Sequence, residues 1–160
     1  MGGFNQNNSS VDAVYSRYAD QLYRLAFTQL SSQQDAEDAV ADVFVKYLAS
    51  PPDFRDENHE KAWFIRVLIN RCRDMQRRKS VRAYTPLDEV IGDIAAPEQS
   101  KQLLEQVRTL PEKYRTAILL HYFEGFSLEE TATILHCTVS AVKMRLLRGR
   151  NELRTTLKGD

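Results

Sequence analysis

The sequence predicts an all-α protein of two small helical domains joined by a flexible linker, the C-terminal domain carrying a helix-turn-helix. Three observations predict this. Apolar residues recur at helical spacing through most of residues 11–79 and 97–157. No stretch shows the alternation of a strand, and no repeat period is present. Residues 84–96 contain Pro86, Gly92 and three acids but no basic residue, which marks residues 81–96 as a linker.

The linker and a polar N-terminus set the expected domain boundaries. Residues 1–10 are rich in glycine, asparagine and serine, so we expect a mobile tail. The first domain should span residues 11–80 and the second residues 97–160. A chain of 160 residues is long enough for two small domains, each with its own core.

Three helices are expected in the first domain. The first begins near Val11 and ends at Ser31 and Ser32, which can also cap the second helix. The second ends before Pro51, and the third runs from about residue 60 to 79. The expected core positions are Val11, Val14, Tyr15, Tyr18, Leu22, Leu25 and Ala26, then Ala36, Val40, Val43, Phe44 and Tyr47, then Phe64, Val67, Leu68, Cys72 and Met75.

A helix-turn-helix is expected in residues 110–157. Ser127 and Glu130 have the spacing of a capping box at a helix start, and Gly125 closes the preceding helix. Residues 136–138 interrupt the apolar pattern, and Thr138 is placed to cap a second helix. The interruption is as short as the turn between the two helices of a DNA-reading pair.

The second helix of this pair has an apolar stripe and a cationic opposite face. At 100° per residue the stripe is about 80° wide. It contains Val139, Val142, Leu146, Gly149, Leu153 and Leu157, and the opposite face carries Ser140, Met144, Leu147 and Asn151, flanked by Lys143 and Arg148. Six basic residues and one acid, Glu152, lie between residues 143 and 158, which suits phosphate. A solvated surface helix is the alternative, and Met144 and Leu147 among the cations argue against it.

Charge is segregated along the chain although the totals balance, at 22 basic and 22 acidic residues. Residues 66–82 hold seven basic residues and one acid, whereas residues 33–45 hold four acids and no basic residue. Within the acidic stretch, Asp35, Asp38 and Asp42 fall within about 60° on one helical face. Helix-dipole stabilisation would account for Asp35 but not for Asp42. One surface is therefore expected to bind phosphate and another a basic protein.

The third helix presents a row of polar and basic residues apart from its apolar face. Arg66, Asn70, Arg73 and Arg77 gather within about 60°, with Trp63 beside them. Trp63 has two interpretations. It is either a buried residue at the edge of a solvated face, or part of a platform on which unpaired bases stack while arginines follow the backbone.

Catalytic and metal-binding chemistry is not expected. Cys72 and Cys137 are too few for a disulfide framework, and the sequence has neither a signal peptide nor a long apolar run, so we expect a reducing, cytoplasmic setting without membrane insertion. Cysteine and histidine spacings do not fit a zinc site. Because no phosphate loop or nucleophile motif is present either, we expect no enzyme, no metal and no cofactor.

Three segments, in this order and separation, resemble the extracytoplasmic-function sigma factors of bacterial RNA polymerase. They are DAEDAVADVFVKYL, FRDENHEKAWFIRVLINRCRD and LPEKYRTAILLHYFEGFSLEETATILHCTVSAVKMRLLRGRNELR. The resemblance covers about residues 11–157. Three successive matches are more specific than a helix-turn-helix alone, which many regulators share.

The resemblance implies a division of labour between the domains. The first would bind the polymerase clamp helices and melt the minus-ten promoter element, and the second would read the minus-thirty-five element. Residues 54–61 would be the loop that takes a flipped base, and residues 80–96 would thread toward the polymerase active centre. Core RNA polymerase and promoter DNA would be the partners, with an anti-sigma factor as a candidate third.

The same resemblance assigns residues to these roles. The polymerase-binding residues would be Asp35, Asp38 and Asp42. The minus-ten residues would be Phe54, Arg55, Trp63, Arg66, Asn70, Arg73 and Arg77. The minus-thirty-five residues would be Ser140, Lys143, Met144, Leu147 and Arg148.

The chain departs from the family pattern in the helix-turn-helix. His136 stands where the family usually has glycine, so it must adopt a left-handed conformation or the turn must shift. Thr138 and Ser140 replace the common proline and glycine. Met144 replaces a common serine on the reading face, so the family's promoter sequence does not carry over.

Two other classes of function fit the same residues. A free-standing helix-turn-helix regulator would bind duplex DNA by itself, usually as a dimer on two half-sites, but no separate dimerisation element is evident. A helical adaptor protein would leave both basic faces as solubility charge.

Overall fold

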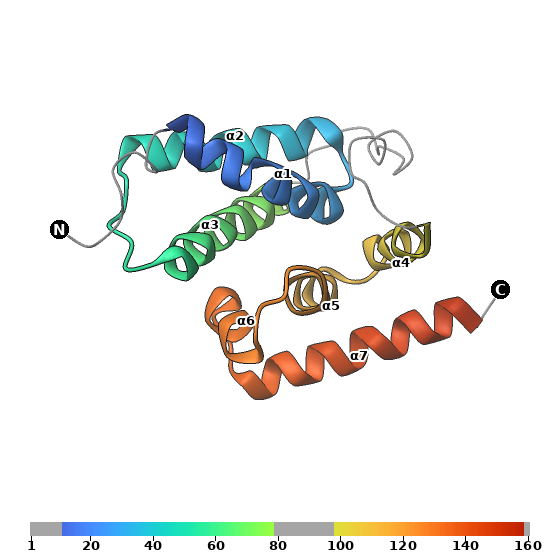
Figure 1. Ribbon diagram of the computed structural model, residues 1–160. Coiled ribbons are helices and arrows are strands. Elements are labelled where there is room, and N and C mark those ends of the chain that lie inside the picture. The colour runs from blue at the N-terminus through green and yellow to red at the C-terminus, as the bar shows by residue number, and fades with distance from the viewer. Residues whose placement is uncertain (1–10, 79–97, 159–160) are drawn as a thin grey trace. The chain divides into compact units, whose positions relative to one another are not determined.

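The computed structural model describes residues 11–78 and 98–158 (Figure 1). The chain divides into two compact units, Met1–Tyr84 and Thr85–Asp160. Within the described residues the secondary structure is helical, with no strand, which confirms the expected fold class. The expected tail, residues 1–10, and linker, residues 81–96, lie outside the described residues.

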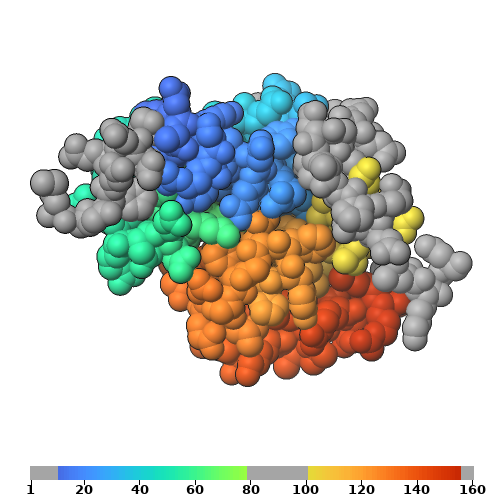
Figure 2. Space-filling view, in the orientation of Figure 1, coloured from blue at the N-terminus to red at the C-terminus, as the bar shows by residue number. Residues whose placement is uncertain are grey.

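The first unit is a three-helix arrangement of α1 Val11–Leu30, α2 Gln33–Ala49 and α3 Glu57–Arg77. Each helix contacts the other two, as Figure 1 shows in blue, cyan and green. The core they enclose contains Leu22, Leu25, Phe27, Val43, Phe64, Ile65, Leu68 and Ile69, all fully buried. Figure 2 shows α1, in blue, and the chain around residues 50–60, in green, at the surface of this unit.

Local capping sets where α2 and α3 begin. The Ser32 hydroxyl accepts a hydrogen bond from the Asp35 amide at 3.2 Å, so the expected cap of α2 is confirmed. The Asp56 carboxylate accepts a hydrogen bond from the His59 amide at 2.8 Å and starts α3 at Glu57. The expectation that α3 starts near residue 60, and that residues 54–61 form one loop, was therefore wrong, because Asp56 supplies an earlier cap.

The buried face of α3 is wider than the sequence suggested. Ile65 and Ile69 are buried, although they were not among the expected core positions, whereas Val67 is only half-buried. The reason is that α3 packs against both α1 and α2, and two neighbours require a wider apolar face than one. Val11 and Tyr15, expected in the core of α1, are exposed.

A buried carboxylate joins α3 to α1. Glu60 is only 1% exposed. Its Oε1 accepts a hydrogen bond from the Tyr18 hydroxyl at 2.6 Å and forms an ion pair with the Arg17 guanidinium. Burial raises the pKa of the Tyr18 phenol well above its ordinary value, and the hydrogen bond to Glu60 raises it further. Because a buried charge needs a partner, Glu60 fixes the start of α3 against α1.

The second unit contains α4 Glu98–Arg108, α5 Glu112–Ile118, α6 Leu128–Leu135 and α7 Val139–Lys158. A π-helical turn, Leu119–Phe123, continues α5, and in it the Glu124 amide donates to the Leu119 carbonyl at 2.9 Å. The apolar pattern of the sequence does not predict this turn. Leu104, Val107 and Leu110 are buried, whereas Leu103 is 40% exposed.

The absence of a side chain at Gly149 brings α5 and α7 into contact. A Cβ atom on Gly149 would lie 2.6 Å from Cδ1 of Ile118 and 3.3 Å from Cβ of Tyr114. The glycine therefore belongs to the packed stripe of α7, beside the buried residues Val142, Leu146 and Leu153. These four residues agree with the expected stripe. Val139, also expected in it, is half-buried, and the side chain of Leu157 lies outside the part of the chain that the structure describes.

Removing the buried carboxylate should destabilise the first unit. We expect Glu60→Ala to lower its free energy of unfolding by about 3 kcal/mol, because Tyr18 and Arg17 lose the acceptor they share. Urea unfolding followed by tryptophan fluorescence measures this, since the chain's single tryptophan, Trp63, lies in this unit. Asp74→Ala is the control: it breaks the exposed pair with Arg77 and should cost less than about 1 kcal/mol. Equal losses in the two variants would contradict the role of Glu60.

Candidate nucleic-acid interface

The three aspartates of α2 do not share one environment. Asp38 and Asp42 are exposed, but Asp35 is only 5% exposed, so the expectation of three exposed carboxylates was wrong for Asp35. The reason is local, because Asp35 lies in the first turn of α2, beside the capping Ser32. Asp38 and Asp42 remain at the surface, four residues apart on one face of the helix.

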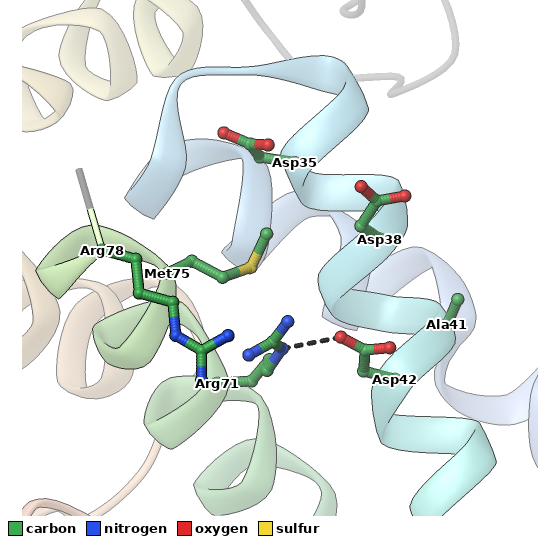
Figure 3. A pocket seen from close by; sticks show the side chains of 7 residues that line it. All are labelled: Asp35, Asp38, Ala41, Asp42, Arg71, Met75 and Arg78. Carbon is green, nitrogen blue, oxygen red and sulfur yellow. Dashed lines mark hydrogen bonds and ion pairs between the residues drawn. The ribbon is translucent and has the colours of Figure 1, made fainter. Parts of the chain in front are cut away.

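Asp42 forms an ion pair with α3. The Arg71 Nε donates to Oδ2 of Asp42 at 2.6 Å, which Figure 3 shows as a dashed line between the two helices. The pair borders a pocket of about 520 Å³ that is lined by Asp35, Asp38, Ala41, Asp42, Arg71, Met75 and Arg78. The acidic surface of α2 is therefore partly compensated from within the first unit, by a residue that the sequence analysis did not single out.

A second hollow lies beside the same ion pair. It measures about 320 Å³ and is lined by Asp42, Val43, Lys46, Val67, Asn70, Arg71 and Asp74. Asn70, which the sequence placed in the basic row of α3, borders this hollow. The Asp42–Arg71 pair consequently contributes to both hollows between α2 and α3.

Trp63 lies in an aromatic cluster at the start of α3. The centroid of its ring is 4.9 Å from the ring centroid of Phe64, 5.9 Å from that of Phe54 and 6.1 Å from that of Tyr47, and each pair is arranged edge to face. Trp63 is half-buried, so it is neither a core residue nor fully exposed. The cluster brings together Phe54 and Trp63, which the resemblance assigns to the same promoter element, and it supports the indole from one side.

The loop before α3 is held by its own polar groups. The Arg55 amide donates to Nδ1 of His59 at 3.1 Å, and the Phe54 ring lies 5.5 Å from the His59 ring. Residues Glu57 to Lys61, expected in this loop, belong instead to the first turns of α3. The irregular segment that precedes Trp63 thus ends at Asp56.

The basic row continues along α3 from Trp63. At 100° per residue, Trp63 and the row Arg66, Asn70, Arg73 and Arg77 fall within about 80° of one another. Asn70 and Arg77 are exposed, and Arg66 and Arg73 are half-buried. Arg77 lies 3.9 Å from Asp74, an exposed pair with little influence on stability. An aromatic edge followed by cations is an arrangement suited to a single nucleic-acid strand.

Glu60 was missed by sequence reasoning. It lies one turn before Phe64 on the core side of α3, and that i, i+4 spacing is the signal that could have revealed it. A charged residue at a position of the apolar pattern is ordinarily expected at the solvent-exposed edge of the buried face. Here its partners come from α1, which the sequence of α3 cannot show.

The helix-turn-helix has the expected caps. The Ser127 amide donates to Oε1 of Glu130 at 2.9 Å, and the Glu130 amide donates to Oγ of Ser127 at 3.0 Å. The Ala141 amide donates to the Thr138 hydroxyl at 3.0 Å, so the cap of α7 is confirmed. His136 adopts the left-handed conformation at φ 54° and ψ 48°, the first of the two outcomes expected for it. The turn therefore keeps its form without glycine.

The face of α7 opposite its buried stripe is open. Met144 is 48% exposed and Leu147 is 44% exposed. The other expected reading residues, Ser140, Lys143 and Arg148, are exposed as well. A neighbouring cation, Arg150, donates to the Tyr122 hydroxyl at 2.6 Å, which ties α7 to the π-helical turn. The helix thus presents a cationic surface with an apolar centre.

Two further observations bear on the classes of function. Across residues 11–78 and 98–158, no helix has both the length and the apolar character needed to span a membrane. In the same part of the chain, no three histidine, cysteine, aspartate or glutamate side chains gather where they could hold a metal ion.

Known proteins resemble both units. The model of Sigma-70 region 2 matches residues 14–82, and the model of Sigma-70, region 4, matches residues 100–153. RNA polymerase sigma factor SigV of Bacillus subtilis (strain 168) is 33% identical over 141 residues, which cover 85% of this chain and 84% of the relative. ECF RNA polymerase sigma factor SigW of the same organism is 29% identical over 159 residues, covering 88% and 85%.

Solved structures share the fold. CnrH, in complex with the cytosolic domain of CnrY, is 25% identical with a TM-score of 0.70, over 99% of this chain and 93% of that chain. The sigma factor RpoE of Bartonella quintana, in complex with the anti-sigma factor NepR, is 22% identical with a TM-score of 0.68, over 93% and 97%. Together with the two matched regions and the identity to SigV over most of both chains, these findings show that the chain belongs to the extracytoplasmic-function sigma factors of bacterial RNA polymerase.

Proposed function

We propose that this sigma factor directs core RNA polymerase to specific promoters by means of three separate surfaces. The exposed aspartates of α2 bind polymerase, the aromatic start of α3 and its basic row bind the melted minus-ten strand, and the open face of α7 reads the minus-thirty-five duplex. The observation that carries the proposal is the presence of two chemically different cationic faces, one on each unit. One is aromatic and suits unpaired bases, and the other is a single helix face that suits a major groove.

The proposed domain roles follow the matched regions. Residues 11–80 would act as the polymerase-binding and melting domain, and residues 97–160 as the duplex-reading domain, with residues 81–96 between them. The proposed minus-ten residues are those of the loop, Phe54 and Arg55, followed by Trp63 and the row Arg66, Asn70, Arg73 and Arg77. The proposed minus-thirty-five residues are Ser140, Lys143, Met144, Leu147 and Arg148.

The proposed polymerase contact centres on Asp38 and Asp42. Both are exposed on α2, whereas Asp35 is buried in the first turn of α2 and lines the same pocket. A basic partner surface would contact both exposed carboxylates and would compete with Arg71 for Asp42. We include an anti-sigma factor as a further partner, because the sigma factor RpoE was solved with one.

We also propose that the protein has no catalytic activity of its own and works in the cytoplasm, where core polymerase is found. The described groups with shifted pKa values gather around Glu60. Burial raises the pKa of Tyr18 and Tyr47, with Glu60 adding to both shifts. Burial lowers the pKa of Arg17, but hydrogen bonding to Tyr18 and Glu60 and the charge of Glu60 together raise it above its ordinary value. These groups connect helices inside the first unit, so their shifts have a structural cause.

Transcription from a library of promoters tests the proposed function. Core polymerase should initiate at a specific subset of promoters only when this protein is present, because each cationic face alone offers a small footprint. Measuring start sites with core alone, with the protein alone and with both provides the comparison. Tight, sequence-specific binding of duplex DNA by the protein alone, unchanged by polymerase, would instead favour a free-standing regulator. If substitution of the basic row of α3 has no effect in any nucleic-acid assay, the helical adaptor protein is favoured instead.

Reversing charge on α2 should weaken binding to core polymerase. We expect Asp38→Lys to lower the affinity about tenfold, because a like charge then faces a basic partner. Titration of labelled protein with core, at low and physiological salt, measures this. Asp20→Lys makes the same charge change on the exposed surface of α1 and should have little effect.

The ion pair allows a second variant in this test. Asp42→Lys alone places a cation beside Arg71, but Asp42→Lys combined with Arg71→Asp preserves an ion pair while reversing the charge on α2. The combined variant should remain folded, and its affinity for core polymerase should be lower than that of the native protein. If Asp38→Lys and the combined variant both bind core polymerase with native affinity, α2 is not part of the polymerase interface.

Melting should depend on the ring of Trp63. We expect Trp63→Leu to slow strand opening on duplex promoters about tenfold, because stacking stabilises a bound base by about 1–3 kcal/mol. A template already unpaired at the minus-ten element should restore part of the rate. Trp63→Phe keeps an aromatic ring in the cluster with Phe54 and should behave almost as the native protein does. Permanganate reactivity measures strand opening.

Two results would contradict the role of Trp63. An equal defect of folded Trp63→Leu on duplex and pre-melted templates would exclude stacking on a melted base. Loss of helical content by circular dichroism in Trp63→Leu would show that the indole serves the fold, through its contacts with Phe54, Phe64 and Tyr47.

A further inference from the structure

The centre of the open face of α7 is apolar. Met144 and Leu147 are 48% and 44% exposed, and at 100° per residue both lie within about 60° of the direction opposite to the buried stripe. The core side of the helix is already supplied by Val142, Leu146 and Leu153, all buried. The packing of this unit therefore does not explain two large apolar side chains directed to solvent.

The charged residues around Met144 and Leu147 indicate which kind of partner binds over these two side chains. Lys143 and Arg148, adjacent in sequence to Met144 and Leu147, are exposed, and Arg154 is exposed one turn and a half further along. The helix carries one acid, Glu152, against six basic residues. A surface with a small apolar centre and a cationic margin complements a polyanion that also offers apolar groups, and duplex DNA has that chemistry.

The major groove contains one apolar group on its base edges, the C5-methyl group of thymine. Met144 and Leu147 are three residues apart, which separates them by about 4.5 Å along the helix axis. Successive bases of a strand are about 3.4 Å apart along the duplex. Residues three apart have Cβ atoms about 5–6 Å apart on the surface of a helix, so the two side chains can reach bases at neighbouring steps of the groove.

We propose that Met144 and Leu147 recognise the C5-methyl groups of thymines at neighbouring positions of the minus-thirty-five element. Lys143 and Arg148 hold the flanking phosphates and fix the register of α7. Neither Met144 nor Leu147 can donate a hydrogen bond, so their readout depends on the methyl group rather than on a donor and acceptor pattern. The proposal rests on the proposed function, because it specifies what the reading face of the second unit selects.

Deoxyuridine provides a test at the level of one methyl group, since it pairs as thymidine does but lacks the C5-methyl. Holoenzyme assembled from the full chain and core polymerase is bound to a promoter selected from the library. Each thymine of its upstream element is replaced in turn by deoxyuridine. Burial of one methyl group corresponds to about fourfold in affinity, so we expect the dissociation constant to rise about fourfold at one or two positions.

The variants assign the effect to particular side chains. Met144→Ser should abolish the sensitivity to deoxyuridine at one position, and Leu147→Ser at another. Leu103→Ser is the matched control, because Leu103 is an exposed apolar residue of the same unit, on α4, and this variant should keep full sensitivity. Circular dichroism verifies that all three variants are folded.

Several results would overturn the proposal. If holoenzyme initiates at the selected promoter but binds thymine and deoxyuridine equally at every upstream position, methyl readout is wrong although the proposed function stands. If Met144→Ser and Leu147→Ser keep the native sensitivity, other residues read the methyl groups. If the two variants weaken binding to core in the absence of DNA, the apolar pair contacts polymerase instead. Failure of the proposed function itself is distinct, since no promoter-specific initiation would then occur.

Discussion

Each unit is so small that a helix can bury only one side of its surface, and the opposite side must remain available to solvent or to partners. In α2 the buried face includes Ala36, Val40, Val43, Phe44 and Tyr47, and the exposed face carries Asp38 and Asp42. In α7 the buried stripe around Val142 and Leu146 leaves the reading face open. Core packing and partner recognition are thus set by the same helical periodicity.

Glu60 is a buried charged residue among the apolar side chains of the first unit, and it lies in the first turn of α3. Its carboxylate joins Tyr18 and Arg17 of α1 to the first turn of α3, one turn before the aromatic cluster. Buried polar groups of this kind orient elements more strictly than apolar contacts do, because a misplaced partner leaves a charge uncompensated. The position of Trp63 relative to α1 therefore depends on a residue that does not itself reach the surface.

The acidic face and the basic row lie on separate helices of the first unit, and an ion pair connects the acidic face of α2 to α3. Arg71 of α3 neutralises Asp42 of α2 in the structure, so the acidic surface has its own internal competitor. A partner that binds Asp42 must displace Arg71 or share the carboxylate with it. The result is a surface whose effective charge is lower than the sequence of α2 implies.

The sequence by itself determined the helical class, the apolar stripes of α2 and α7, and the caps at Ser32, Ser127 and Thr138, because periodicity and caps depend on residues within a few positions of one another. Only the tertiary structure decided that Asp35 is buried, that Arg71 pairs with Asp42, and that Glu60 meets Tyr18 across 42 positions of sequence. Those outcomes depend on which helix packs opposite each residue. The width of the core face of α3 was decided in the same way, since its two neighbours, and not its own pattern, require Ile65 and Ile69 inside.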